Sequence, residues 1–462
     1  MKDYSGFSFW LETSGDDLTP RPGIDGSIHA DIAILGAGFS GLWTAYYLIK
    51  QDPSLRIVIL EKEIAGFGAS GRNGGWCVAE FPYPLRSLID NYGPETARSI
   101  QEQMVQSVNE IGSVCESEGI DAHYAKTGTF DIARSPHQVP EIHEHLDTLT
   151  EIGQEADFRI VSGPELRQDI RVSNVQAALW NRNGASVQPA ALARGLARAV
   201  EKLGVTIFEQ TAVTGYETQP RPRLKTERGD VWAETLVLAG EAYLSQLPQV
   251  GRQIMPMTSH MVVTEPLPDE LWAQIGWGNR QVITGPGTNG GYLNHTRDGR
   301  IAFGAYRAVN PFRSKITDDL DQQEEIFAHA RTSAREWFPL LRLHGISFTH
   351  AWGGVFGVPR DRMPTMRYDR ETGIASTRGY TGEGVATSNL GGRMLADQIL
   401  DRVTELTVLP MASHHSPDWE MEPLRWAGTQ LVKRGLQRAE RQAKESGEKS
   451  DKPTLAQRIW NR

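Results

Sequence analysis

The stretch from residue 31 to residue 41 decides the fold, and it reads Asp31-Ile32-Ala33-Ile34-Leu35-Gly36-Ala37-Gly38-Phe39-Ser40-Gly41. After Asp31 the residues are apolar, as in a parallel strand buried on both faces. Gly36 then allows a tight turn, Gly38 lets a backbone approach a pyrophosphate, and Gly41 lets the next helix pack closely on the strand. From Leu42 to Ile49 the apolar residues recur with helical spacing. The stretch therefore predicts a strand, a phosphate-binding turn and a helix.

The eighteen residues from Ile32 to Ile49 carry no charge, so by length alone this run could span a membrane. However, a second apolar strand over 56–60 ends at Glu61, twenty positions after Gly41. An acid at this distance can accept hydrogen bonds from a ribose, and the whole pattern is the fingerprint of a dinucleotide-binding βαβ unit. We therefore predict nucleotide binding by Gly36, Ala37, Gly38, Phe39, Ser40, Gly41, Glu61 and Lys62.

The composition is that of an ordinary globular enzyme. The chain has 462 residues, of which 39% are hydrophobic and 23% charged, and its formal net charge is −9. Because nucleic-acid binding needs a basic surface, we expect no nucleic-acid partner. The two cysteines, Cys77 and Cys115, offer no metal-ligand spacing. We expect two reduced thiols, no metal and a cytoplasmic protein, either a monomer or a homo-oligomer.

A second glycine-rich segment follows Glu61 and reads Gly66-Phe67-Gly68-Ala69-Ser70-Gly71-Arg72-Asn73-Gly74-Gly75-Trp76. Glycines this dense beside a nucleotide site let backbone N–H groups approach a ligand. Arg72 can place a positive charge near the pyrophosphate, and Asn73 with the Gly74-Gly75 backbone can reach a ring system. We therefore add Gly68, Ala69, Ser70, Arg72, Asn73, Gly74, Gly75 and Trp76 to the predicted cofactor site.

With these motifs the chain resembles the FAD-dependent amino acid oxidase (DAO) superfamily, and within it the γ-glutamylputrescine oxidoreductase-like and glycine oxidase-like flavoproteins. The resemblance extends through residues 184–189, 205–213 and 236–240 to the segment Gly379-Tyr380-Thr381-Gly382-Glu383-Gly384-Val385-Ala386. It implies FAD contacts by Val213, Ala239, Gly240, Gly382, Gly384, Val385 and Ala386. A helix that begins after this segment would stabilise an anionic reduced flavin.

The resemblance also implies a fold and a reaction. We expect a Rossmann-like α/β FAD-binding domain beside an α+β substrate domain with a mainly antiparallel sheet. In the family an amine gives a hydride to flavin N5, and the imine product hydrolyses to a carbonyl compound. Some relatives hold FAD covalently through a histidine near the second glycine-rich loop or a late cysteine. This chain has no histidine between His29 and His123 and no cysteine after Cys115, so we expect noncovalent FAD.

The substrate region departs from the glycine oxidase pattern. In that branch an arginine upstream of Pro359 grips the substrate carboxylate, whereas Phe356 occupies the aligned position here. Phenylalanine cannot make a bidentate carboxylate contact, which favours an amine without a free α-carboxylate. A one-residue gap would instead give the role to Arg360 or Arg362. The substrate candidates are Trp76, Trp352, Phe356, Arg360, Arg362 and Glu383, and Glu383 can attract a cationic amine. No catalytic base is assigned.

The predicted FAD-binding domain is discontinuous, with residues 28–85, 150–240 and 345–410, and the substrate domain takes 86–149 and 241–344. Residues 411–462 form a helical tail with a basic face, which we expect to dock on the protein rather than lie on a membrane. Apolar residues between Ser5 and Leu11 are expected to pack on the body of the protein.

Four functions remain open at this stage. The first is an FAD-dependent amine oxidase or dehydrogenase that passes electrons to O₂ or another acceptor. The second is an N-methyl or D-amino acid oxidase that binds a carboxylate through Arg360 or Arg362. A flavin monooxygenase is disfavoured because no second nucleotide fingerprint would hold NADPH. The last is a non-catalytic flavin-binding or membrane-associated scaffold.

Overall fold

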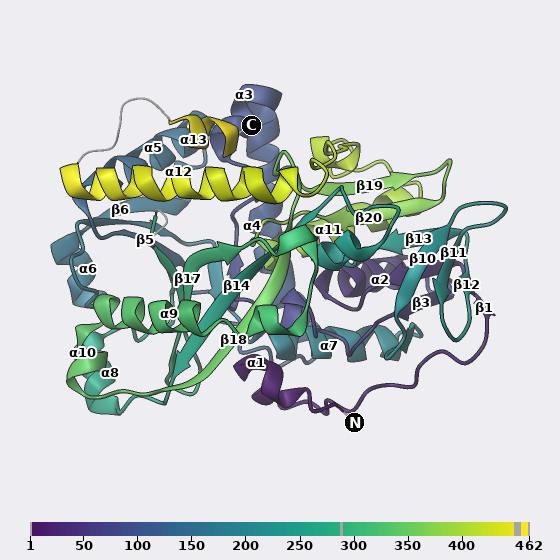
Figure 1. Cartoon of the computed structure of the whole chain (residues 1–462), viewed down its shortest axis with the longest axis horizontal. Helices are drawn as coiled ribbons and strands as arrows, with labels where there is room; N and C mark the ends of the chain where they lie inside the picture. Colours follow the sequence, from purple (N-terminus) through teal and green to yellow (C-terminus); the bar gives the residue numbers. More distant parts are fainter. Residues whose placement is uncertain (1, 287–289, 448–453, 461–462) are drawn as a thin grey trace.

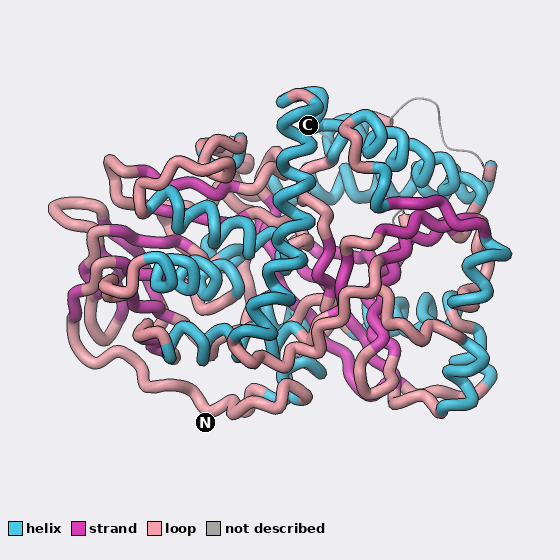
Figure 2. The backbone as a smooth tube through the Cα atoms, turned by 180° about the vertical axis from the view of Figure 1, so that it is seen from behind, coloured by secondary structure: helices cyan, strands magenta, loops and turns pink. Residues whose placement is uncertain are grey.

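Two large sheets organise the chain in the computed structural model, which describes residues 2–286, 290–447 and 454–460. The six-stranded sheet lies on one side of the molecule and the eight-stranded sheet on the other (Figure 1). Seen from behind, the long helix α4 (Pro94–Ser117) stands between them (Figure 2). The mixed α/β fold and the mainly antiparallel second sheet agree with the expectation from the sequence.

The six-stranded sheet contains the strand and helix predicted from the opening stretch. Its order is β19 (Thr365–Asp369), β20 (Ile374–Arg378), β13 (Thr235–Leu238), β2 (Ile32–Leu35), β3 (Ile57–Leu60) and β9 (Thr206–Phe208). All pairs are parallel except β19 with β20. Helices α2 (Phe39–Gln51), α7 (Pro189–Lys202) and α11 (Gly384–Ile399) pack together beside this sheet. The uncharged run is thus divided between β2 and α2, and no helix in the described ranges has the length and apolarity needed to cross a bilayer.

The eight-stranded sheet is antiparallel except where β15 pairs with β5. Its order is β18 (Phe348–Val358), β14 (Met255–Thr264), β17 (Ile301–Val309), β16 (Gly291–His295), β15 (Val282–Thr284), β5 (Thr129–Ala133), β7 (Ala177–Asn181) and β6 (Phe158–Ser162). Helices α8 (Asp269–Ile275), α9 (Glu324–Trp337) and α10 (Pro339–Leu343) share an apolar core with one face of this sheet.

Three strands lie in a different sheet from the one implied by the predicted domain boundaries. Strands β6, β7 and β18 fall in ranges assigned to the FAD-binding domain, yet all three belong to the eight-stranded sheet. The reason is strand pairing, since β18 pairs with β14 from Met255 to Thr264 and β7 pairs with both β5 and β6. The boundaries themselves stay a prediction.

Smaller elements complete the fold. A four-stranded sheet contains β1 (Ile28–His29), β12 (Val231–Trp232), β11 (Arg223–Thr226) and β10 (Val213–Glu217), and β4 (Trp76–Val78) pairs with β8 (Gly184–Ser186). The remaining helices are α1 (Phe9–Glu12), α3 (Leu85–Tyr92), α5 (Val139–Glu151), α6 (Gly163–Asp169) and α13 (Leu455–Trp460).

The basic C-terminal helix α12 (Leu424–Ser446) docks on the chain itself. Thr429 accepts a hydrogen bond from Asn310 at 2.8 Å, and the Lys433 ammonium donates to the carbonyl of Ala308 at 2.9 Å. The Trp426 ring also meets Phe312 edge to face. These contacts place the helix along the end of β17, in agreement with the docking expected from the sequence.

Candidate functional site

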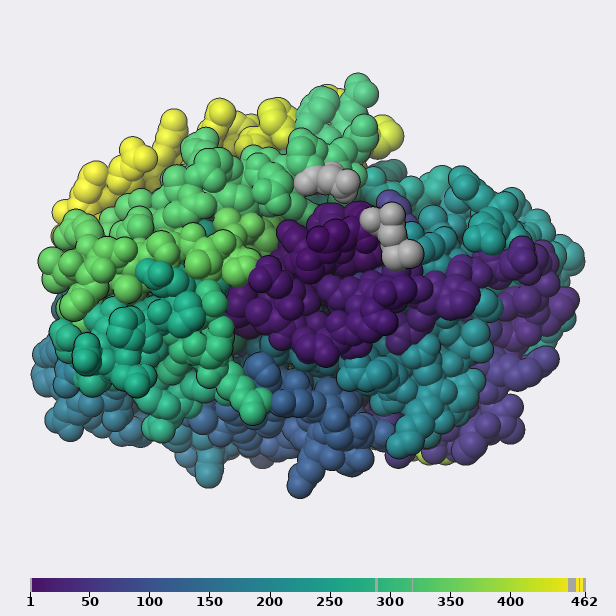
Figure 3. Space-filling model, turned by 90° about the horizontal axis from the view of Figure 1, so that it is seen from below, coloured from purple at the N-terminus to yellow at the C-terminus, as the bar shows by residue number. Residues whose placement is uncertain are grey.

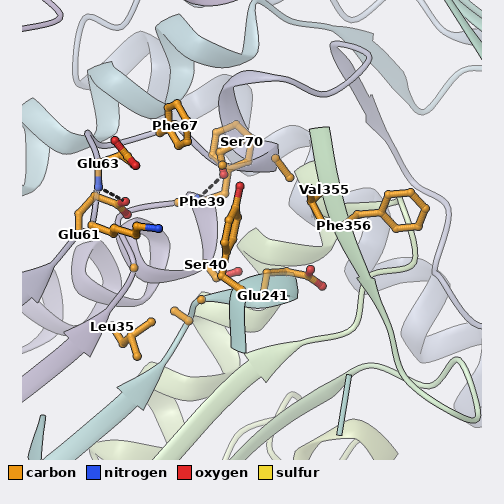
Figure 4. A pocket seen from close by; sticks show the side chains of 18 of the residues that line it. Leu35, Phe39, Ser40, Glu61, Glu63, Phe67, Ser70, Glu241, Val355 and Phe356 are labelled. Carbon is orange, nitrogen blue, oxygen red and sulfur yellow. Dashed lines mark hydrogen bonds between the residues drawn. The ribbon is translucent and has the colours of Figure 1, made fainter. Parts of the chain in front are cut away.

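One cavity of about 390 Å³ lies at the carboxyl ends of β2, β3 and β13 (Figure 4). This is the edge of a parallel sheet where nucleotides bind in open α/β folds. Most of the predicted cofactor residues line it: Gly36, Gly38, Phe39, Ser40, Glu61, Lys62, Gly68, Ala69, Ser70, Arg72, Asn73, Val213, Ala239, Gly240, Gly382, Gly384 and Val385. Folding thus brings together residues from five separated stretches of the chain.

Six predicted cofactor residues are not part of the cavity lining. Ala37, Gly41 and Ala386 are packed in the core, and Gly74, Gly75 and Trp76 contact the eight-stranded sheet. A Cβ on Gly41 would lie 2.0 Å from the carbonyl oxygen of Gly36, so this glycine allows the close helix packing expected of it. These residues shape the cavity but do not line it.

The first glycine turn is built as the fingerprint predicts. Gly36 has φ +100°, a left-handed conformation that favours glycine, and a Cβ there would lie 2.8 Å from the carbonyl oxygen of Ala239. The Glu61 carboxylate accepts hydrogen bonds from the N–H groups of Ala37 and Glu63, both at 2.9 Å. Burial raises the pKa of Glu61 to about 7, and these two hydrogen bonds oppose the rise.

Hydrogen bonds of its own side chains hold the second glycine-rich segment in place. Ser70 Oγ accepts the N–H of Phe39 at 2.8 Å, which ties this segment to the start of α2. The Asn73 amide donates to the carbonyls of Ala69 and Ser70, and its Oδ1 accepts the N–H of Gly75 at 2.8 Å. Asn73 therefore stabilises the conformation of this loop beside the cavity.

Arg72 lies in the cavity wall, where its charge is already paired. Its guanidinium is buried and forms an ion pair with Asp321, and it donates to the Tyr243 hydroxyl at 2.8 Å. Asp321 belongs to the 3₁₀ turn Asp318–Asp321, which lies between β17 and α9 and contacts β18. No sequence pattern indicated Asp321 or Tyr243, since both are brought to Arg72 only by folding.

The last glycine turn is held by two residues that sequence reasoning missed. Glu241 accepts hydrogen bonds from the N–H groups of Gly379 and Tyr380 at 2.9 and 3.3 Å. Its backbone φ of +47° is unusual for a glutamate. The Tyr380 hydroxyl is 2.8 Å from Ser40 Oγ, so it links this turn to α2. The position directly after Gly240 was the only sequence signal for Glu241.

Among the predicted substrate residues, Phe356 lines the cavity, whereas Trp352, Arg360 and Arg362 lie outside its lining. Phe356 belongs to β18. Trp352, on the same strand, is buried and donates its indole N–H to the carbonyl of Arg72 at 2.9 Å. Arg360 lies outside the cavity, where its guanidinium pairs with Glu420 at 3.2 Å and covers the Trp419 ring. Arg362 also lies outside the cavity lining, near Tyr83.

Glu383 belongs to an acidic and aromatic group formed by Glu80, Asp131, Glu383, Trp76, Tyr292 and Tyr306. Burial raises the pKa of Glu383, and the charge of Glu80 adds to the rise. Burial also raises the pKa of Asp131 to about 7, again with a contribution from Glu80. The rings form a continuous row, with Tyr292 at 5.4 Å from Trp76 and 5.6 Å from Tyr306 between centroids.

Tyr306 belongs to β17 of the eight-stranded sheet, and its hydroxyl interacts with Thr284 on β15 of the same sheet. The Tyr306 hydroxyl is 2.9 Å from Thr284 Oγ1, and Thr284 is the register partner of Asp131. The Tyr306 side chain is 41% exposed, and desolvation of its hydroxyl together with the charges of Glu383, Asp131 and Glu80 raises its pKa. The charges of three carboxylates therefore act on the hydroxyl of one tyrosine.

Three histidines of the eight-stranded sheet make structural contacts. His260 Nε2 is 2.9 Å from the carbonyl of Leu320, and His295 stacks on Trp272. His350 pairs with Glu12 at 3.1 Å. None of the three lines the cavity in the described part of the chain.

The cavity fits a flavin dinucleotide. Its glycine turns leave room for a ligand backbone, an acid ends the second strand, and a helix N-terminus faces the same space. The cavity lies at the edge of a parallel sheet, and a strand of the antiparallel sheet closes it on another side. This arrangement is that of the FAD-dependent oxidoreductases.

The comparisons with known proteins identify the family within this class. Residues 31–398 match the DAO family model, described as FAD dependent oxidoreductase, and the chain belongs to this family. It is 27% identical to γ-glutamylputrescine oxidoreductase of Escherichia coli over 396 residues, which cover 84% of this chain and 88% of that protein. It is 23% identical to glycine oxidase of Bacillus licheniformis over 382 residues, covering 80% and 93%.

Solved structures show the same fold. Glycine oxidase from Geobacillus kaustophilus superposes with a TM-score of 0.71 at 19% identity, covering 84% of this chain and 98% of that one. L-Proline dehydrogenase from P. horikoshii superposes with a TM-score of 0.68 at 18% identity, covering 84% and 96%.

Proposed function

We propose that this FAD-dependent oxidoreductase oxidises the C–N bond of a cationic aliphatic amine that lacks a free α-carboxylate, such as a γ-glutamylated polyamine. The observation that carries the proposal is the group of three carboxylates around Tyr306. The raised pKa values of Asp131 and Glu383 mean that these carboxyls hold protons more readily than usual, and an incoming ammonium ion would favour their ionised form whereas a carboxylate would oppose it. The resemblance to γ-glutamylputrescine oxidoreductase supports the same class of substrate.

The arginines also support an amine. Phe356 lines the cavity where the glycine oxidase pattern has a carboxylate-binding arginine. Arg72 is the one arginine among the described residues that line the cavity, and Asp321 already neutralises it. Arg360 is engaged with Glu420 away from the cavity. A substrate carboxylate would therefore meet no arginine free of an acidic partner in this lining.

The residues in the cavity lining would hold FAD without a covalent bond, and we propose the predicted residues that line the cavity as its contacts. When bound, FAD supplies the two-electron acceptor for the oxidation. An ammonium substrate must lose a proton before the adjacent C–H bond can give up its hydride. Glu383 is the candidate to take that proton, because a carboxylate with a raised pKa is a stronger base than an ordinary one.

An anaerobic panel tests the proposal. The holoenzyme is mixed with diamines, γ-glutamylated diamines, N-methyl amino acids and D-amino acids, and the loss of flavin absorbance is followed. We expect amines to bleach the flavin and amino acids to leave it oxidised. Bleaching by amino acids alone would overturn the proposal.

An N-methyl or D-amino acid oxidase is the second candidate function. Arg362 favours it, because this arginine is largely buried with its pKa lowered by burial, and it lies near Tyr83. In that case Arg362→Ala raises KM for amino acids and leaves KM for plain amines unchanged. Arg360→Ala is the matched comparison at a position that contacts Glu420.

A further inference from the structure

The N-terminal segment Tyr4–Ser14 lies outside the part of the chain that matches the family model, yet it covers the second glycine-rich loop. In the space-filling view the purple N-terminal residues cross the middle of one face of the molecule (Figure 3). Trp10 and Phe9 are each only 2% exposed, so this segment is part of the folded body and not a loose extension.

Three successive backbone carbonyls of the loop each accept one hydrogen bond from a side chain. Ser8 Oγ donates to Gly71 at 2.9 Å, Trp352 Nε1 donates to Arg72 at 2.9 Å, and Trp10 Nε1 donates to Asn73 at 2.7 Å. Two of these three donors come from the N-terminal segment. All three donor residues are at most 4% exposed, so water does not compete strongly for these bonds.

The orientation of the carbonyls fixes the N–H groups on the other side of the same peptides. In a planar trans peptide, the C=O of one residue and the N–H of the next point in opposite directions. The bonds from Trp352 and Trp10 therefore turn the N–H groups of Asn73 and Gly74 away from the two indoles. Within the described ranges, these two N–H groups donate to no protein group. Asn73 itself lines the cofactor cavity.

Trp10 is held in place from the opposite side. Its backbone carbonyl accepts a hydrogen bond from the Gln188 amide at 2.5 Å, and Gln188 is 2% exposed. Its ring also meets the Trp352 ring edge to face, with centroids 6.1 Å apart. The indole N–H is thus aimed at the loop by contacts on several sides.

We propose that Trp10, together with Ser8, is a positioning residue of the flavin site: the two side chains hold the carbonyls of Asn73 and Gly71, and with them the part of the loop that lines the cofactor cavity. The segment then contributes to the cofactor site, although it lies outside the residues that match the family model. The inference depends on FAD binding and not on the identity of the substrate.

The substitution Trp10→Phe tests the proposal because it keeps a ring and removes the N–H donor. Tyr4→Phe is the matched control in the same segment. It removes a hydroxyl that bonds Glu63 and Gln210, each at 2.8 Å, and neither bond reaches the loop. The measurements on each holoenzyme are the FAD dissociation constant, the visible flavin spectrum and the melting temperature.

We expect Trp10→Phe to weaken FAD binding about five- to tenfold, as for one lost buried hydrogen bond, and to shift the flavin absorption bands. Ser8→Ala should weaken binding in the same direction, and Tyr4→Phe should leave both readouts unchanged. A purely structural role would lower the melting temperature of Trp10→Phe and Tyr4→Phe alike without moving the spectrum. That result, or an unchanged FAD affinity in Trp10→Phe, would overturn the proposal.

Discussion

The substitution Asp131→Asn should stabilise the protein at alkaline pH, because the folded protein holds the carboxyl of Asp131 away from water. Burial and the neighbouring Glu80 raise its pKa from 3.8 to about 7. For an acid, a raised folded pKa means that the folded state prefers the protonated form. The stability linked to this group is therefore fully present below pH 4 and is lost as the pH rises through about 7.

The size of the expected stabilisation follows from the rise in the pKa of Asp131. A rise of about three pKa units corresponds to about 4 kcal/mol above pH 7, at 1.36 kcal/mol for each unit. Asp131 keeps some accessible surface, so solvent screening reduces the expected gain to roughly 2 to 4 kcal/mol. At about 2 °C for each kcal/mol, this gives a rise in melting temperature of roughly 4 to 8 °C.

Thermal melts of the holoenzyme between pH 4 and pH 8 measure this difference. Asparagine cannot ionise, so the gain of the variant over the wild type should be small at pH 4, grow with pH and level off above pH 7. Asp147→Asn on the exposed side of α5 is the control and should behave like the wild type at every pH. A gain that does not grow with pH, or a less stable variant at pH 8, refutes the reasoning.

Three further predictions concern the cavity. Gly41→Ala should abolish FAD binding, measured as the flavin-to-protein ratio, because its Cβ meets Gly36 at 2.0 Å, whereas Gly428→Ala on α12 has open space and should bind normally. Glu241→Ala should weaken FAD binding about tenfold and Glu241→Gln much less, since glutamine keeps an acceptor for Gly379 and Tyr380. Glu383→Gln should lower kcat/KM for cationic amines about tenfold in steady-state kinetics and leave the FAD affinity unchanged. An equal loss for uncharged substrate analogues would contradict the role of Glu383 in attracting a cation.

Local sequence patterns predicted many of the residues that line the cavity. The turn at Gly36 and the acid at Glu61 depend on residues close in the chain, so spacing alone identifies them. Pairs such as Arg72 with Asp321, or Trp10 with Asn73, are brought together only by tertiary packing, and no local pattern encodes them.

The same distinction between local patterns and long-range packing explains why three strands belong to another sheet than the predicted domain boundaries imply. Strand β18 follows the substrate region and precedes the last glycine turn, so its place in the chain suggested the FAD-binding domain. Its pairing with β14 is a long-range choice that the sequence does not reveal. The three carboxylates near Tyr306 also come from distant segments, and of these three only Glu383 was recognisable beforehand, from its place in the last glycine motif.

The reduction of the flavin by matched substrate pairs tests the central claim most directly. Each pair consists of an N-methyl or D-amino acid and the amine that remains when its α-carboxylate is removed. Rapid mixing without oxygen gives the reduction rate and the apparent affinity for both members of a pair. The acidic group near Glu383 and the absence of an unpaired arginine among the described residues lining the cavity predict that the amine is the better substrate in every pair. Faster reduction by the amino acids would contradict the account.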